Sequence, residues 1–342
     1  MRIAFFDTKP YDRGAFEAIS GEYPFKIDYF ESRLTPATAK LAADHDVVCA
    51  FVNDDLGAET VGILASLGVR LLALRCAGFN NVDLAAACGR MQVVRVPKYS
   101  PYAVAEFALS LLLCLNRKLH RAYNRVREGN FALSGLQGMD IHGKCVGVVG
   151  TGKIGEIFAR LMNGFGVRLL LSDPYSNGKL AEELHAEYVP LERLYRESDI
   201  ISLHCPLTPE NTHMIDARAI DAMKDGVILI NTSRGRLVDT PALIEGLKSG
   251  HVRAAGLDVY EEEAGYFFED RSDRVISDDV LARLMAIPTV LLTSHQAFLT
   301  TEALENIART TLDNVLEFSE GRPLTNGICS GCVRKDCPSS GK

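Results

Sequence analysis

The chain has no tryptophan, and it has no uninterrupted hydrophobic run long enough to cross a membrane. Its longest apolar stretch, residues 103–115, is broken by Glu106 and Ser110 and falls short of the roughly 18–20 residues that a spanning helix needs. The N-terminal residues MRIAFFDTKP lead directly into a strand-like pattern, without the apolar core or the cleavage site of a secretion signal. The sequence therefore predicts a cytoplasmic protein with no membrane partner.

An excess of positive charge is also lacking. Asp and Glu number 44 against 37 Lys and Arg, which gives a formal net charge of −7 at pH 7. Nucleic acids and most biological membranes are anionic, so a chain with a negative net charge is not expected to bind either as its main partner. The charge balance thus argues against nucleic-acid binding.

The cysteines do not provide a complete metal site. Six of the nine stand singly in apolar surroundings, where a free cysteine behaves as a small hydrophobic residue. The other three form a C-x2-C-x4-C pattern near the C-terminus, but a structural zinc site needs four ligands and no fourth is evident nearby. We therefore expect no metal, and a flexible, redox-sensitive tail over residues 329–342. The three cysteines of this tail are Cys329, Cys332 and Cys337.

What the sequence does have is length and a regular alternation of strand-like and helical segments. With 342 residues, 47% of them hydrophobic, two domains with separate cores are the default expectation. An amphipathic helix from Pro101 to about Arg127 separates two series of strands, and a closing helix is expected over about 300–320. Alternation of this kind predicts two α/β lobes, each a parallel sheet covered on both faces by helices, with a boundary near 99–101. The expected strands are 2–7, 26–30, 47–52, 69–74 and 92–96 in the first series, and 144–150, 169–173, 199–205, 227–232, 254–259 and 289–295 in the second.

The segment CVGVVGTGKIGEIFARL, residues 145–161, is the most informative local motif. Gly150, Gly152 and Gly155 form a G-x-G-x-x-G pattern between a β-branched strand and an apolar helix, which is typical of dinucleotide binding. The helix N-terminus would offer free N–H groups to a pyrophosphate. Asp173 ends the next strand, where its carboxylate can accept hydrogen bonds from the ribose hydroxyls and would repel a 2′-phosphate. The motif therefore predicts NAD as cofactor, in preference to NADP.

Motifs over residues 1–325 resemble the D-isomer-specific 2-hydroxyacid dehydrogenases. Three of them, FVNDD, FFED and HQAFLT, are similar to the branch of that family that acts on D-lactate. The full set is FVNDD (51–55), LRCAGFNNVDL (74–84), VVRVPKYSP (93–101), VGTGKIG (149–155), ISLHCPLTPEN (201–211), NTSRGRLVDT (231–240), GLDVYEEE (256–263), FFEDRSD (267–273) and HQAFLTTEAL (295–304).

The resemblance implies how the two lobes are connected. In this family a Rossmann-type NAD-binding domain, here residues 101–298, is inserted into a discontinuous flavodoxin-like substrate domain, here 1–100 and 299–328. Substrate is expected in the cleft, with closure about hinges near 99–101 and 296–300. The family also implies a homodimer or homotetramer. One departure is Phe107, which stands where relatives commonly have histidine in A-V-A-E-H.

Reduction of a 2-oxo acid requires a cation for the carboxylate and a proton donor for the carbonyl oxygen. Arg234 lies just beyond a predicted strand, at the sheet edge where ligands bind, and a guanidinium suits a planar carboxylate. His295 ends another strand at the same edge and can be protonated near neutral pH. A carboxylate partner would favour the imidazolium, but nothing local distinguishes the three neighbouring glutamates Glu261, Glu262 and Glu263.

The resemblance selects among these side chains. It implies Arg234 as the substrate-binding cation, His295 as the proton donor and Glu263 as its partner, which leaves Glu261 and Glu262 as loop charges. Arg236, two residues beyond Arg234, is not expected to be the substrate-binding cation, and His204, His213 and His251 are less expected than His295 as the proton donor. Further cofactor contacts are implied for Lys153, Ile154, His204, Cys205, Pro206, Asn211, Thr232, Ser233, Arg234 and Asp258, and substrate contacts for Ala77, Gly78 and Tyr99, with Phe51 and Phe298 as the wall around the substrate's methyl group.

The activity that the resemblance implies is the reversible, NADH-dependent reduction of pyruvate to D-lactate. One alternative is a related enzyme for another 2-oxo acid, such as phenylpyruvate, oxaloacetate or hydroxypyruvate. Another is a dinucleotide-sensing binding protein, because some transcriptional corepressors have the same fold and retain similar catalytic residues. Formate dehydrogenases are less similar, since they would have glutamine at the position of Glu263.

Overall fold

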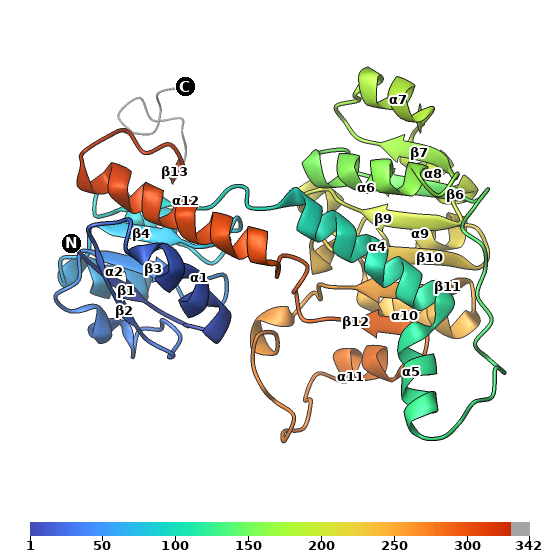
Figure 1. Cartoon of the computed structure of the whole chain (residues 1–342), viewed down its shortest axis with the longest axis horizontal. Coiled ribbons are helices and arrows are strands. Elements are labelled where there is room, and N and C mark those ends of the chain that lie inside the picture. The colour runs from blue at the N-terminus through green and yellow to red at the C-terminus, as the bar shows by residue number, and fades with distance from the viewer. Residues whose placement is uncertain (330–342) are drawn as a thin grey trace. The chain divides into compact units, whose positions relative to one another are not determined.

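The structure is a computed structural model that describes residues 1–329. The chain forms two compact units, which are described separately. Unit 1 consists of Met1–Ser100 together with the segment that begins at Leu299, and unit 2 is Pro101–Phe298 (Figure 1). The predicted tail cysteines Cys332 and Cys337 lie outside the described residues, whereas Cys329 is half-buried.

Unit 1 is a six-stranded sheet in the order β13-β5-β4-β3-β1-β2. The central strands β3 and β4 are buried at every residue, which is why they read as continuous apolar runs in the sequence. The strands are β1 (Arg2–Phe5), β2 (Lys26–Tyr29), β3 (Val47–Ala50), β4 (Leu71–Leu74), β5 (Gln92–Val94) and β13 (Gly327–Ile328), and the helices are α1 (Pro10–Ser20), η1 (Ala39–Ala42), α2 (Ala58–Ser66), α3 (Leu84–Ala87) and α12 (Thr301–Ser319).

One strand of unit 1 runs against the others. β13 pairs antiparallel with β5, with Gly327 opposite Val94 and Ile328 opposite Val93, so this sheet is mixed and not wholly parallel. The preceding residue Asn326 supports the pairing, because its carbonyl accepts from the backbone N–H of Arg95. Sequence periodicity did not predict β13, since two residues are too few to show an alternation.

Unit 2 is a seven-stranded, wholly parallel sheet in the order β12-β11-β10-β9-β6-β7-β8. α4 and α6 pack together on one face, in front of the sheet in Figure 1. α8–α11 cover the core on the other face. The predicted class, two α/β lobes built on parallel strands, is confirmed. The strands are β6 (Cys145–Val149), β7 (Arg168–Ser172), β8 (Glu187–Tyr188), β9 (Ile200–Leu203), β10 (Val227–Asn231), β11 (Val252–Leu257) and β12 (Val290–Leu292).

In unit 2 the carboxyl ends of the parallel strands, and the loops that follow them, lie along one edge of the sheet. At β6 the strand order reverses, with β7 on one side and β9 on the other, and ligands of open α/β sheets bind at such a switch point. The helices are α4 (Pro101–Arg117), α5 (Leu119–Arg127), α6 (Lys153–Asn163), α7 (Gly178–Leu184), α8 (Leu191–Glu197), η2 (Pro209–Asn211), α9 (Ala217–Ala222), η3 (Gly235–Leu237), α10 (Thr240–Ser249), η4 (Glu263–Gly265) and α11 (Asp279–Ala286).

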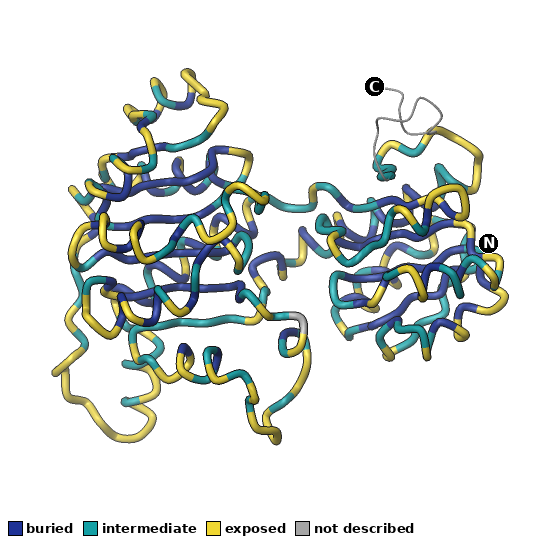
Figure 2. The backbone as a smooth tube through the Cα atoms, turned by 180° about the vertical axis from the view of Figure 1, so that it is seen from behind, coloured by how far each residue is buried: buried dark blue, intermediate teal, exposed yellow. Residues whose placement is uncertain are grey.

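The helix predicted over 101–127 is not continuous. Lys118 adopts a left-handed conformation with φ of 54° and separates α4 from α5, while its Nζ atom donates to the carbonyl of Gly135. α4 is buried along one side, where the half-buried Phe107 joins the core, but α5 buries none of its residues (Figure 2). A left-handed lysine has no distinct sequence signal, so the pattern predicted one helix.

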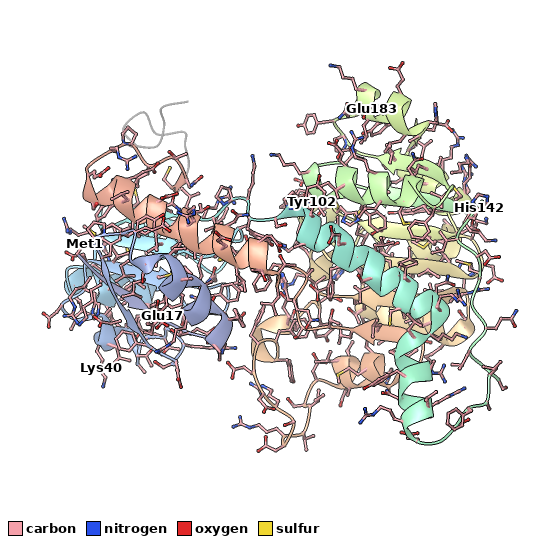
Figure 3. All side chains as sticks on the ribbon, viewed as in Figure 1. Met1, Glu17, Lys40, Tyr102, His142 and Glu183 are labelled. Atoms are coloured by element: carbon pink, nitrogen blue, oxygen red, sulfur yellow. The ribbon has the colours of Figure 1, made fainter. Side chains whose placement is uncertain are left out.

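An ion pair joins two helices on the surface of unit 2. Glu183 of α7, labelled in Figure 3, forms an ion pair of 2.7 Å with Arg160 and so ties α7 to α6.

Within residues 1–329, no helix is long and apolar enough to cross a bilayer. The cytoplasmic location stays a prediction.

Candidate active site

The glycine motif forms a tight turn between β6 and α6. Gly150 has φ of 88°, and a Cβ atom there would lie 2.6 Å from the backbone nitrogen of Cys205. A Cβ on Gly155 would lie 1.9 Å from the carbonyl oxygen of Gly150, so only glycine lets α6 approach this closely. Gly152 caps α6 in an extended conformation, and, apart from its chain neighbours, no atom of the described residues lies within 4 Å of the place that its Cβ would take. Space is therefore open beside Gly152, at the N-terminus of the helix that begins with Lys153 and Ile154, where a helix offers free N–H groups to a phosphate.

Asp173, just after β7, is held beside this turn. Its two carboxylate oxygens accept hydrogen bonds from the backbone N–H groups of Thr151 (2.6 Å) and Tyr175 (2.8 Å). The carboxylate is thereby fixed next to the glycine turn and remains half-exposed. This is the arrangement that a ribose-binding acid needs.

His204 follows β9 on the other side of the turn, and its ring is directed into the protein. It packs against Phe158 of α6 with ring centroids 4.8 Å apart, and its Nε2 atom lies 2.8 Å from Ser202 Oγ. Burial lowers the pKa of His204 to about 3, so the imidazole is neutral and is excluded as a general acid. If His204 contacts the cofactor, as the sequence predicts, its backbone must do so.

The loops after β9 and β10 are bonded to each other at the same sheet edge. Ser233 Oγ donates to the carbonyl of Cys205 at 2.5 Å, and Asn211 Nδ2 donates to the carbonyl of Pro206 at 2.7 Å. Thr232, the first residue after β10, is buried. The structure thus brings the predicted cofactor residues of these two loops together.

Arg234 stands at the start of η3, two residues beyond Thr232. Its carbonyl accepts from Asn231 Nδ2 at 2.9 Å, and its Nη1 atom donates to the carbonyl of Ser233 at 2.7 Å. No carboxylate among the described residues forms an ion pair with this guanidinium. A half-buried arginine without a protein counter-ion is suited to an anionic ligand.

His295 and Glu263 form the pair that the resemblance implies. His295 Nδ1 lies 2.8 Å from Glu263 Oε1, and each side chain is 25% exposed. The other oxygen of Glu263 accepts from the backbone N–H of Tyr260 at 3.1 Å. Because a carboxylate only accepts, Nδ1 carries the hydrogen and Nε2 is left to face a ligand.

Asp258 anchors the turn on which His295 stands. Its carboxylate accepts from Thr293 Oγ1 (2.6 Å) and from the backbone N–H groups of Ala297 (2.8 Å) and Gln296 (2.9 Å). His295 itself has φ of 56° and donates its backbone N–H to the carbonyl of Asp258 at 2.7 Å. Burial raises the pKa of Asp258, and these donors oppose the rise. Asp258 therefore fixes the backbone turn that carries His295. Its contact with the cofactor stays a prediction.

The three neighbouring glutamates have three different partners. Glu262 forms an exposed ion pair with Arg236 at 2.8 Å, which fits the prediction of a loop charge. Glu261 does not fit it: its side chain is only 16% exposed, and it accepts from His213 Nε2 at 2.6 Å and from the backbone N–H of Thr240 at 2.8 Å. The interpretation of Glu261 as a solvated loop charge is therefore wrong.

Most of the predicted substrate residues belong to unit 1, at the carboxyl ends of β3, β4 and β5. The carbonyl of Ala77 accepts from Arg95 Nη1 at 2.9 Å, and the carbonyl of Gly78 from Cys76 Sγ at 3.2 Å. The carbonyl of Tyr99 accepts from Asn306 Nδ2 of α12 at 2.9 Å. Phe51 follows β3 and is 8% exposed, whereas Phe298, 9% exposed, closes unit 2.

Sequence reasoning missed two residues beside these sites. Arg75, which precedes the Ala77–Gly78 segment, is 1% exposed and lies over the rings of Phe5 (4.5 Å) and Phe51 (4.8 Å). The available signal was a charge at the end of the apolar run LLAL. Phe268 lies beside His295, with ring centroids 6.0 Å apart, and has φ of 66°. No sequence pattern predicts this conformation.

Comparison with known proteins places this geometry in a family. The NAD binding domain of the D-isomer specific 2-hydroxyacid dehydrogenases matches residues 109–297. The D-lactate dehydrogenase of Escherichia coli is 50% identical over 329 residues, which cover 96% of this chain and 100% of that protein. A 2-hydroxyacid dehydrogenase homolog of Haemophilus influenzae is 51% identical over 95% of this chain and 98% of its own.

Solved structures agree with the sequence comparison. The pyruvate reductase of Chlamydomonas reinhardtii superposes with a TM-score of 0.92 at 44% identity, covering 95% of this chain and 98% of that one. The apo-structure of the Escherichia coli D-lactate dehydrogenase superposes with a TM-score of 0.89 at 48% identity, covering 96% of this chain and 100% of that one. The chain therefore belongs to the D-isomer-specific 2-hydroxyacid dehydrogenases, which use NAD.

Proposed function

We propose that this enzyme reduces pyruvate to D-lactate with NADH and catalyses the reverse oxidation. The observation that carries the proposal is the 2.8 Å contact between His295 Nδ1 and Glu263 Oε1, which directs a protonatable nitrogen away from its partner carboxylate. Relatives named D-lactate dehydrogenase and pyruvate reductase, which match nearly the whole chain, support the choice of substrate.

The residues around the glycine turn fit NAD. The free N–H groups at the start of α6 would hold the pyrophosphate, the open space at Gly152 admits it, and Asp173 would accept from the ribose hydroxyls. Bound NADH supplies the hydride for the carbonyl carbon. The loops that contain Cys205, Pro206, Asn211 and Ser233 would line the rest of the cofactor site.

Two residues at the carboxyl ends of β12 and β10 would protonate the carbonyl oxygen of the substrate and bind its carboxylate. His295 Nε2 donates the proton to the carbonyl oxygen, and Glu263 stabilises the imidazolium before transfer. The Arg234 guanidinium holds the carboxylate in a bidentate manner and polarises the ketone. The remaining proposed contacts to the substrate are the backbone N–H groups of Ala77 and Gly78, the side chain of Tyr99, and an apolar wall of Phe51 and Phe298.

The proposal is tested with a panel of 2-oxo acids assayed with NADH and with NADPH, followed by determination of the chirality of the product. We expect the highest kcat/KM for pyruvate with NADH, and D-lactate as the product. Efficient turnover of phenylpyruvate, oxaloacetate or hydroxypyruvate without turnover of pyruvate would contradict the substrate assignment. Tight NADH binding without turnover of any 2-oxo acid would contradict the enzymatic function.

We also propose that the chain forms a homodimer or homotetramer. α5 has no buried residue and exposes Leu119, Tyr123 and Val126, each more than half accessible. The segment after it exposes Phe131 (74%) and Leu133 (82%), an unusual amount of apolar surface for one region of a monomer. Sedimentation equilibrium measures the assembly state, and Phe131→Ser with Leu133→Ser is expected to weaken the association. A monomer at micromolar concentration would contradict the proposal.

A further inference from the structure

Glu261 joins three segments of unit 2 that are distant in sequence. One carboxylate oxygen accepts from His213 Nε2 at 2.6 Å, and the other accepts from the backbone N–H of Thr240, at the first turn of α10, at 2.8 Å. The side chain is 16% exposed, so both bonds are partly shielded from water. A carboxylate with both oxygens engaged in this way fixes its own loop against His213 and α10.

The segment that Glu261 holds is the one that follows Arg234. His213 donates its backbone N–H to the carbonyl of Arg236 at 2.8 Å, and Ile215 donates to the carbonyl of Leu237 at 3.0 Å. Residues 213–215 therefore pair with 236–238 along the backbone, and His213 reaches from this pairing to Glu261. Glu261 is thus linked to the loop over 234–240 at two points, at Arg236 through His213 and at Thr240 directly.

The same loop touches the acidic segment directly. A Cβ on Gly235 would lie 2.1 Å from the carbonyl carbon of Tyr260 and 2.5 Å from the backbone nitrogen of Glu261, so the two backbones are in close contact there. Two residues beyond Glu261 stands Glu263, the partner of His295. The loop that carries Arg234 is therefore packed against the segment that carries Glu263.

We infer that Glu261 and His213 are positioning residues that hold the loop of Arg234 in register with Glu263 and His295. Neither residue touches the reacting atoms. Their effect is on the direction of the Arg234 guanidinium, and so on the binding of the substrate carboxylate. This inference rests on the proposed function in naming a 2-oxo acid as the ligand of Arg234.

The bond between His213 and Glu261 forms although the backbone conformation of His213 is unfavourable. It has φ of 54°, a conformation that side chains other than glycine adopt at some expense, and both its backbone N–H and its ring are bonded to neighbours. Loss of Glu261 removes the acceptor for the ring and for Thr240 together. We expect the loop to relax away from the acidic segment, while the bond between Glu263 and His295 stays intact.

The kinetic test compares Glu261→Ala with the matched control Glu262→Ala, whose parent residue forms an ion pair with Arg236 of the same loop that is exposed and therefore contributes little. We expect Glu261→Ala to raise KM for the 2-oxo acid by up to about tenfold, with kcat changed less, because the charge-assisted hydrogen bonds that are lost hold the loop and do not contact the substrate. The Kd of NADH and the shape of the pH–rate profile are expected to stay as in the wild type. His213→Ala should act in the same direction, and His213→Gln, which keeps a donor for Glu261, should recover most of the loss.

A second measurement does not depend on the substrate. Hydrogen–deuterium exchange of the NAD-bound enzyme is expected to be faster over residues 234–240 in Glu261→Ala than in Glu262→Ala. Equal exchange in the two variants would overturn the inference, and so would faster exchange with an unchanged KM, since the pair would then be structural only. If the wild type reduces no 2-oxo acid, the proposed function fails, and the exchange comparison alone decides whether Glu261 anchors this loop.

Discussion

His295 Nδ1 lies 2.8 Å from Glu263 Oε1, and the two side chains are equally exposed. Because Glu263 holds the His295 ring with Nδ1 as its donor, Glu263→Gln is expected to lower kcat for reduction of the 2-oxo acid by misdirecting the proton-donating nitrogen. Steady-state kinetics with NADH and the 2-oxo acid measure this loss. Glu262→Gln should keep the wild-type kcat, and equal values of kcat for both variants would contradict the role of Glu263.

Replacement of His295 itself should have a larger effect. His295→Asn keeps a polar side chain but removes the group that donates the proton, so the rate of reduction is expected to fall by roughly 10²–10⁴-fold. NADH binding, followed by fluorescence, is expected to change little, since the proposed cofactor contacts lie elsewhere. A variant that retains wild-type turnover would exclude His295 as the general acid.

The sequence predicted the two α/β lobes because buried parallel strands leave a strong signal, continuous apolar runs between amphipathic helices. It did not predict the break at Lys118 or the two-residue strand β13, which depend on backbone geometry and on pairing with distant residues. The glutamates show the same limit at the candidate site. Their partners are His213, Arg236 and His295, which are brought together only by the fold, so local sequence could not distinguish Glu261 from Glu262.

A loss of stability at acid pH is expected from His204, whose Nδ1 atom is buried. Its pKa is lowered from 6.5 to about 3 in the folded chain, so between these values the unfolded chain binds a proton that the folded chain does not. The contribution of His204 to the free energy of unfolding is therefore lost as pH falls from above about 6.5 towards about 3. At pH 5 this loss is about 2 kcal/mol.

Urea unfolding at pH 7 and pH 5 measures this effect. His204→Gln is expected to lower stability at pH 7 through lost packing on Phe158, but to show a smaller further decrease between pH 7 and pH 5 than the wild type. His185, an exposed histidine at the end of α7, provides the control, and His185→Gln should follow the wild type. The same decrease in His204→Gln as in the wild type would show that His204 is not the group responsible.

Phe268 is expected to contribute to catalysis without contributing much to stability. A bulky residue with φ of 66° is strained, and the centroid of its ring lies 6.0 Å from that of the His295 imidazole. Phe268→Gly removes both the strain and the ring, so we expect a several-fold lower kcat with a melting temperature close to that of the wild type. A melting temperature lower by 10 °C or more, a large shift by the usual scale of about 2–4 °C per kcal/mol for larger domains, would show that Phe268 is mainly structural.

Asp173 should determine the choice between NADH and NADPH. Its carboxylate is held by the backbone N–H groups of Thr151 and Tyr175, and the negative charge opposes a 2′-phosphate. Asp173→Asn removes the charge while keeping an oxygen that can accept from one of these donors. We expect KM for NADH to rise by about tenfold, the size of a lost charge-assisted hydrogen bond, and the ratio of kcat/KM for NADH over NADPH to fall by at least as much. Asp270, an exposed carboxylate in the loop before α11, serves as the control through Asp270→Asn. A ratio that is unchanged in Asp173→Asn would mean that another group rejects the 2′-phosphate.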